Sequence, residues 1–111
     1  MHTGQITRGL RPSWEPLNEL VGRDLVPGFM WTYALSLDDG ATVHAYRNVS
    51  TRRLLHLSED GRAFVCRPGL GYEEQSPSAA LQDVFAGWEE AVPQPKKPEA
   101  VRALLERAQA A

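Results

Sequence analysis

Four arginines near the middle of the chain are the residues whose chemistry stands out first. They are Arg47, Arg52, Arg53 and Arg67, and an aromatic residue, Trp31, precedes them in the same predicted sheet. A guanidinium group binds oxyanions through paired hydrogen bonds, and an aromatic ring next to it can stack on a nucleobase. These residue types indicate recognition of an anionic group, which would be an acidic partner, a phosphate or a nucleic acid backbone.

The chain also carries acids that would neutralise the same arginines internally. Asp83, Glu89 and Glu90 follow the predicted sheet, and Glu73 and Glu74 lie in the loop directly after it. If these carboxylates pair with the arginines, the charges belong to the fold and no partner is needed. The sequence alone leaves both interpretations open.

A second group of candidate residues is His44, His56, Cys66 and Tyr46. Two histidines and a thiol on one sheet face would form a small pocket with the elements of a nucleophilic site. Metal binding is disfavoured, because the sequence has neither a CxxC nor an HxxxH pair. We expect no metal ion and no cofactor, and a lone cysteine on a strand is most often a small apolar residue.

The elements that position these residues are predicted to form a four-stranded antiparallel meander. From Phe29 to Leu37 apolar residues alternate with smaller or more polar ones, which indicates a half-buried strand. Two turns ending in Asp-Gly follow, and each fits a three-residue hairpin loop with glycine in the left-handed position. The predicted strands are 29–37, 41–48, 52–57 and 62–67.

The loop lengths predict which residues face one another. The first hairpin places Leu35 opposite Val43, Tyr33 opposite Ala45 and Trp31 opposite Arg47. The last places Leu57 opposite Ala63, Leu55 opposite Val65 and Arg53 opposite Arg67. For the middle hairpin the pattern favours Val43 opposite Leu57 and Arg47 opposite Arg53, which would bring Trp31, Arg47, Arg53 and Arg67 into one row across the strands.

This register divides the apolar side chains between the two sheet faces. One face would carry Phe29, Trp31, Tyr33, Leu35, Leu37, Val43, Leu55, Leu57 and Val65, and the helices would pack on it. The other would carry His44, facing His56, with Cys66 and Tyr46 nearby.

Helices are predicted before and after the sheet in the sequence. One begins near Pro16, a second follows Ser76-Pro77, and a proline-rich linker at 93–98 leads into a terminal helix over 98–111. The fold class is therefore α+β, a meander sheet with one N-terminal and two C-terminal helices, in a single domain whose residues 1–12 form a flexible arm. A terminal helix this short is marginal alone, so it docks on its own sheet or on a partner chain, including a second copy.

Composition and charge narrow the compartment and the functional class of the protein. The net charge is −2, yet residues 44–67 hold five arginines against two acids and are basic between acidic flanks. No segment approaches the length of a membrane span, a single cysteine argues against disulfides, and the excess of arginine over lysine is typical of GC-rich bacteria. We expect a cytoplasmic, non-catalytic binding or interaction module with an anionic partner, nucleic acid being less favoured. A small enzyme with its pocket at His44, His56 and Cys66 is the alternative.

Overall fold

Six antiparallel strands and three α-helices form residues 1–110, the part of the chain that this computed structural model describes. The strands pair in chain order and are β1 (Gly4–Ile6), β2 (Phe29–Leu37), β3 (Thr42–Asn48), β4 (Leu54–Ser58), β5 (Ala63–Arg67) and β6 (Gly71–Gln75). The helices are α1 (Glu15–Val21), α2 (Pro77–Val84) and α3 (Pro98–Ala110), with 3₁₀ turns η1 (Val26–Gly28) and η2 (Trp88–Glu90). The α+β class, the antiparallel sheet and the helices are confirmed. The predicted number of four strands is wrong.

The two additional strands lie where the sequence has no alternating apolar pattern. β1 is three exposed residues within the predicted flexible arm, and it pairs with the end of β2. Its Gly4 lets Leu35 and Tyr72 lie close to the backbone, because a Cβ there would stand only 2.8 Å from a Leu35 methyl group and 2.9 Å from the Tyr72 ring. β6 contains two glutamates and a glutamine and was expected to be a loop, but it pairs along β5.

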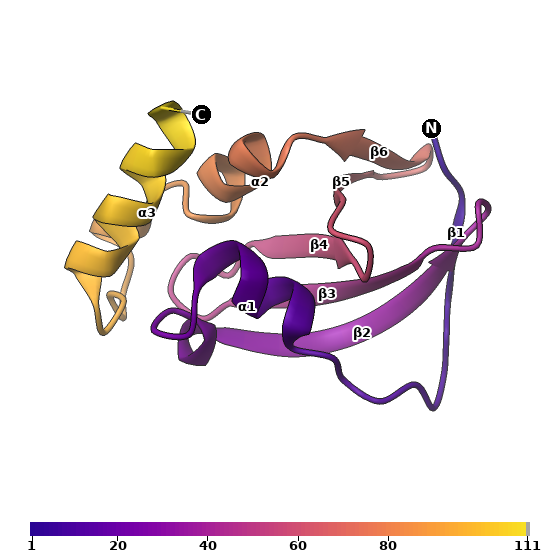
Figure 1. The fold of residues 1–111 in the computed structure, drawn as a ribbon, viewed down its shortest axis with the longest axis horizontal. Coiled ribbons are helices and arrows are strands. Elements are labelled where there is room, and N and C mark those ends of the chain that lie inside the picture. Colours follow the sequence, from indigo (N-terminus) through magenta and orange to yellow (C-terminus); the bar gives the residue numbers. More distant parts are fainter. Residues whose placement is uncertain (111) are drawn as a thin grey trace.

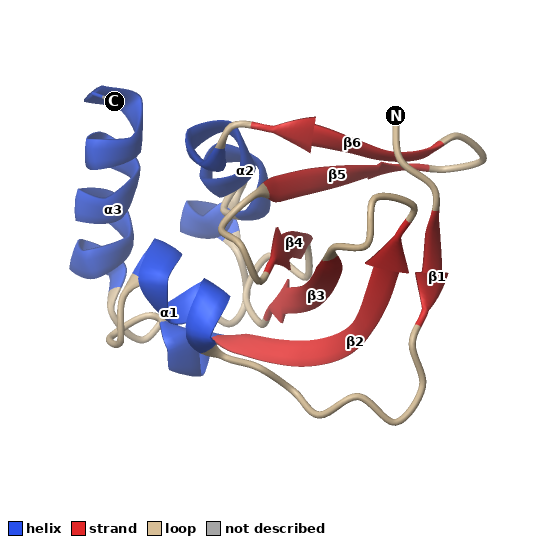
Figure 2. Ribbon diagram, turned by 45° about the vertical axis from the view of Figure 1, so that its right-hand side comes forward, coloured by secondary structure: helices blue, strands red, loops and turns tan. Residues whose placement is uncertain are grey.

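The sheet curls until its first and last strands meet. His2 and Tyr72 exchange two backbone hydrogen bonds of 2.7 Å each, which join the segment before β1 to β6. In Figure 2 the strands curve from β2 at the bottom, through β1 at the right, to β6 at the top. The strand edges are thereby paired at this end of the molecule, which removes a site for edge-to-edge association.

The curled sheet separates two apolar clusters. The outer cluster joins the sheet to the helices, which all lie at one side of the molecule (Figure 1), and it contains Phe29, Tyr46, Leu55 and Leu57. The inner cluster lies on the other sheet face and contains Leu35, Leu37, Val43 and Phe64, flanked by Tyr33 and Tyr72. The prediction that Leu35, Leu37 and Val43 share the helix-covered face with Phe29, Leu55 and Leu57 is therefore wrong.

A β-bulge divides the apolar residues of β2 between the two clusters. The pairing shifts between Trp31 and Tyr33, and the hydroxyl of the extra residue, Thr32, donates to the Ala45 carbonyl at 2.9 Å. Leu35 pairs with Val43 and Tyr33 with Ala45, as predicted, but Trp31 pairs with Tyr46 instead of Arg47. One added residue therefore sends Phe29 and Trp31 to the helix side.

The register of the middle hairpin is wrong by one residue. His44 pairs with Leu57 and Arg47 with Leu54, because the loop is one residue longer than expected. The Asn48 side chain accepts hydrogen bonds from the amides of Ser50 and Thr51, and Arg52 takes the left-handed φ of 64° that closes the loop. In the last hairpin, the pairing of Leu57 with Ala63 is confirmed.

The serine and proline residues that signal helix starts in the sequence correctly predict where the helices begin. Ser76 caps α2, its hydroxyl accepting a hydrogen bond from the Ala79 amide at 3.1 Å, and Pro77 and Pro98 are the first residues of α2 and α3. α3 buries Val101, Leu104 and Ala108 in the outer cluster, so its apolar face is used within the chain. None of the helices in residues 1–110 combines the length and the apolar character needed to cross a bilayer.

Candidate functional site

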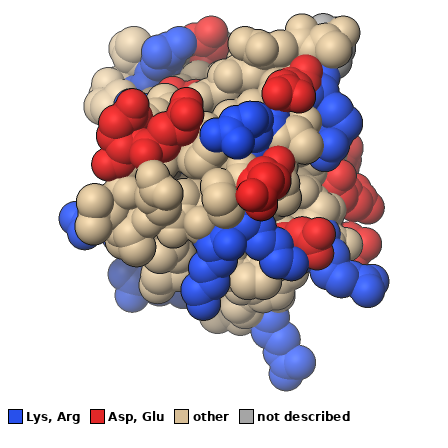
Figure 3. All heavy atoms as spheres, turned by 90° about the vertical axis from the view of Figure 1, so that its left-hand side faces the viewer, with Lys and Arg blue, Asp and Glu red and all other residues tan. Residues whose placement is uncertain are grey.

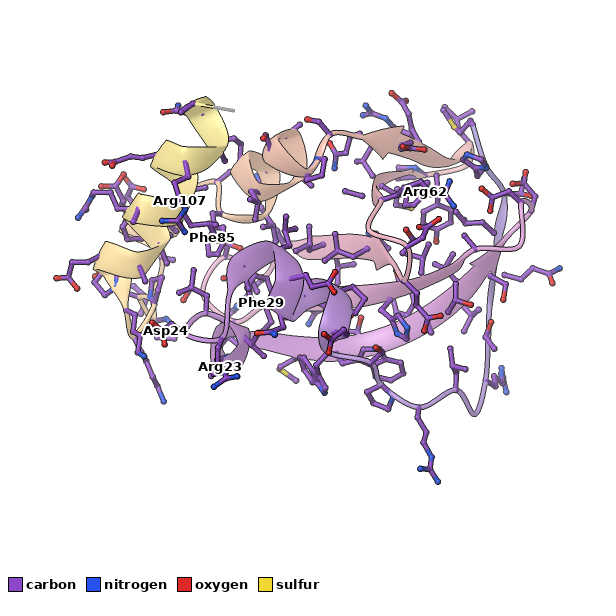
Figure 4. The ribbon with its side chains drawn as sticks, in the orientation of Figure 1. Arg23, Asp24, Phe29, Arg62, Phe85 and Arg107 are labelled. Carbon is purple, nitrogen blue, oxygen red and sulfur yellow. The ribbon has the colours of Figure 1, made fainter. Side chains whose placement is uncertain are left out.

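A hollow with apolar walls lies between the proline-rich linker and the sheet, and we call it the linker pocket. It has a volume of about 350 Å³, and its walls include Leu25, Phe29, Val49, Phe85 and Val101 together with linker residues 93–97. Phe29 and Phe85 meet edge to face at 5.8 Å, and both lie at the helix end of the molecule (Figure 4). The pocket therefore has a floor of buried aromatic rings.

Local hydrogen bonds fix the walls of the linker pocket. The amide of Val49 donates to the Gly28 carbonyl at 2.9 Å, which holds the β3–β4 turn against η1. The hydroxyl of Thr51 donates to the Val84 carbonyl at 2.6 Å and ties the same turn to the end of α2. Segments far apart in the sequence are thus held in place around the cavity.

Charged side chains surround the opening of the linker pocket. Arg23 and Asp24 come from the turn after α1, and Lys96 and Lys97 come from the linker. Lys97 Nζ lies 3.3 Å from Asp24 Oδ1, and both side chains are mostly exposed. Within residues 1–110 neither Arg23 nor Lys96 has an ion pair, so the opening carries an excess of positive charge.

A larger hollow of about 630 Å³ lies between the segment before α1 and η1, but it is more open. Its walls include Pro12, Ser13, Trp14 and Asn18, none of which is buried. It lacks the buried aromatic floor of the linker pocket. The linker pocket is therefore the better ligand site, since binding sites are concave and mostly apolar with few polar groups.

The predicted row of arginines is not formed. Because the middle hairpin is shifted by one residue, Arg47 faces Leu54, and Arg53 lies outside the β4–β5 pairing. The chain's own acids take two of the arginines: Arg53 lies 3.5 Å from Asp83, and Arg67 lies 3.4 Å from Glu73. Arg47 and Arg52 are exposed and have no ion pair within residues 1–110.

These arginines are expected to contribute little to stability. Replacing both Arg47 and Arg53 by alanine breaks only the exposed pair with Asp83, and exposed pairs contribute about 0–1 kcal/mol. Urea unfolding of the double variant should therefore give a free energy of unfolding within about 1 kcal/mol of the wild type. A variant that fails to fold would show that these arginines hold the sheet together.

The four residues of the predicted second site lie on opposite faces of the sheet. Tyr46 belongs to the outer cluster, and His44, two residues before it in β3, lies on the same face. His56 pairs with Phe64 of the inner cluster. Cys66, two residues further along β5, is exposed. The sheet thus separates His44 and Tyr46 from His56 and Cys66.

His44 is held in a chain of polar contacts with Trp31. The indole Nε1 of Trp31 donates to His44 Nδ1 at 3.0 Å, so the proton of the neutral ring lies on Nε2, which is 3.1 Å from a Glu59 carboxylate oxygen. His44 is fully buried and both its ring nitrogens are engaged. Trp31 therefore orients a histidine and does not form an exposed platform for a base.

His56 and Cys66 belong to a cluster completed by Tyr33 and Tyr72. The Tyr33 hydroxyl lies 2.9 Å from His56 Nε2, and the His56 and Tyr72 rings are 5.5 Å apart. Burial lowers the pKa of His56 to about 4, and burial followed by the charges of Tyr33 and Cys66 raises the pKa of Tyr72 to about 12. No hydrogen bond joins Cys66 to either histidine within residues 1–110, so no nucleophile and base pair is assembled.

One further group of possible metal ligands lies at the other end of the molecule. His2, Asp38 and Asp39 bring their ligand atoms within 4.8 Å of one another, and both aspartates are exposed. Arg62 lies 3.0 Å from Asp39, and Figure 4 shows it far from the linker pocket. Its guanidinium already supplies positive charge to this cluster.

The comparisons with known proteins give no relative. No protein-family model, no curated protein and no solved structure matches this chain.

Sequence reasoning missed the linker pocket, although one signal pointed to it. Both lysines of the chain are adjacent, at Lys96 and Lys97, within the proline-rich linker. The sequence predicts only a proline-rich linker at 93–98 that leads into the terminal helix. In the structure it forms a wall of the pocket and carries part of the positive charge at its opening.

Proposed function

We propose that this chain is a non-catalytic binding module whose ligand-binding site is the linker pocket. The observation that carries the proposal is the apolar cavity of about 350 Å³ with Phe29 and Phe85 in its floor. Ligand sites commonly have volumes of roughly 300–1,000 Å³ and mostly apolar walls. This volume suits a small ligand or a single chain of apolar groups.

Two further features support binding over catalysis. The described residues that line the linker pocket include neither histidine nor cysteine, and their one serine, Ser50, has no hydrogen bond to their one carboxylate, Asp24, so no nucleophile and base pair is assembled. Their charged groups stand at the opening, where they select a ligand, and their apolar groups stand at the floor. The proposal keeps the binding module that the sequence suggests, but it assigns the binding site to the linker pocket instead of the sheet.

The proposal predicts saturable binding of an uncharged apolar dye, and Nile red is a suitable probe. Val49 is 40% exposed and lines the pocket, so Val49→Trp should place an indole in the cavity and weaken dye binding at least about tenfold without disturbing the core. Fluorescence titration measures the affinity, and thermal unfolding confirms that the variant is folded.

The matched control is Leu70→Trp. Leu70 is another exposed apolar residue, at 69%, and it lies in the β5–β6 turn and does not line the pocket. This variant should bind the dye as the wild type does. Equal binding by the wild type and both variants would place the dye elsewhere and contradict the proposal.

A further inference from the structure

The charges at the opening of the linker pocket are unevenly balanced. Arg23, Lys96 and Lys97 contribute three positive charges and Asp24 one negative charge. Figure 3 views the molecule from the α3 side and shows Lys and Arg side chains gathered over the lower half of this face. A ligand that enters the pocket therefore passes groups that attract an anion and repel a cation.

We propose that the linker pocket binds an aliphatic monocarboxylate. Its carboxylate replaces Asp24 as the partner of Lys97, and its hydrocarbon chain lies against Phe29 and Phe85. This inference rests on the proposed function, because it names the ligand class of the same site.

The Asp24–Lys97 pair suits such an exchange. Its atoms are 3.3 Å apart, and the side chains of Lys97 and Asp24 are 56% and 72% exposed. A pair this exposed contributes little to stability, so giving it up costs the fold little. A carboxylate anchored through its chain in the cavity is held at high local concentration beside Lys97 and competes effectively with Asp24.

The interior of the pocket indicates that the rest of the ligand is hydrocarbon. Within residues 1–110 every buried side-chain nitrogen or oxygen has a hydrogen-bond partner. The lining is mostly apolar, and its one buried polar side chain, Asn48, already uses its oxygen to accept from the amides of Ser50 and Thr51, whereas a hydrocarbon chain gains from leaving water. A sugar, a nucleobase or a second charge would meet few polar partners at that depth.

The test uses three probes that share one chain and differ in the head group: octanoate, octanol and octylammonium. Isothermal titration calorimetry of the full chain should give the tightest binding for octanoate, about three- to tenfold weaker binding for octanol, and the weakest for octylammonium. Added salt should weaken octanoate binding and leave octanol binding nearly unchanged.

Charge variants at the opening locate the head group. Lys97→Gln should weaken octanoate binding about three- to tenfold and leave octanol binding unchanged. Asp24→Asn should strengthen octanoate binding by a similar factor, because it removes the competing carboxylate. The matched controls are Arg11→Gln and Glu19→Gln, which make the same charge changes at exposed residues that do not line the pocket, and they should leave octanoate binding within about twofold.

The outcomes separate this inference from the proposed function. If Nile red and octanol bind in the pocket but octanoate binds no more tightly than octanol, the monocarboxylate is wrong and the binding module stands. If neither Nile red nor any octyl probe binds, the proposed function fails as well. If light scattering shows a dimer in which Val49→Trp prevents association, a second copy occupies the pocket, and the inference is overturned.

Discussion

Gly71→Ala is expected to lower the free energy of unfolding by about 2–3 kcal/mol. Gly71 has a φ of 124°, which side-chain-bearing residues rarely adopt, and a Cβ there would clash with the backbone oxygen of His2. That oxygen accepts the hydrogen bond from the Tyr72 amide that closes the sheet. The substitution therefore strains the backbone and pushes apart the segment before β1 and β6.

Gly69→Ala is the control for Gly71→Ala, because both glycines lie at the β5–β6 hairpin. Gly69 also has a positive φ, 76°, but a Cβ there would meet nothing within 4 Å. We expect a loss of about 1 kcal/mol for Gly69→Ala, from backbone strain alone. Urea unfolding measures both values, and hydrogen exchange at the Tyr72 amide reports on the closure. Equal losses for the two variants would show that the closure adds nothing to stability.

Features that depend on local sequence could be predicted. Ser76 and Pro77 start α2 because a hydroxyl cap and a fixed φ act on adjacent residues. The Asp-Gly turns fix the pairing of Leu35 with Val43 and of Leu57 with Ala63, since loop length and glycine conformation determine the register beside them. Within a few residues of each signal, these predictions are confirmed.

The predicted sheet faces are wrong where a single extra residue reverses which face the neighbouring strand residues lie on. The bulge at Thr32 sends Trp31 to the helix face, and the left-handed Arg52 lengthens the middle turn. An arginine at positive φ is uncommon, so the sequence gives no reason to expect it. With strands of period two, either change alone moves every residue beyond it to the opposite face, and this separates His44 from His56.

The linker pocket could not be predicted, because its walls come from segments far apart in the chain. Phe29 starts a strand, Phe85 follows a helix, and each has the spacing of an ordinary core residue. The cavity beside these rings is completed by residues of the linker and of the β3–β4 turn, which are distant in the sequence. The charges were easier to anticipate: Asp83 and Glu73, which were considered as internal partners of the arginines, do pair with Arg53 and Arg67.

Stability should decrease as the pH falls from 6.5 to 4 because of His56. Its side chain is buried, and burial lowers its pKa from 6.5 to about 4. Between these values the unfolded chain binds a proton at this residue and the folded chain does not. Unfolding then takes up a proton, so acid favours the unfolded state. The His56 contribution is complete above pH 6.5, and roughly 3 kcal/mol is lost by pH 4.

His56→Gln should remove most of this dependence, because glutamine keeps an acceptor for the Tyr33 hydroxyl and does not titrate. Urea unfolding from pH 4.5 to 7.5 should give a steep stability profile for the wild type and a flatter one for the variant. Hydrogen bonds from His2, from the Ala41 amide and from Ser58 lower the pKa values of Asp38, Asp39 and Asp60, so these carboxyl groups lose their protons below this range. His2→Gln is the control, since His2 is less buried, and it should keep the wild-type slope. A variant His56→Gln that is as sensitive to acid as the wild type would assign the pH dependence to other groups.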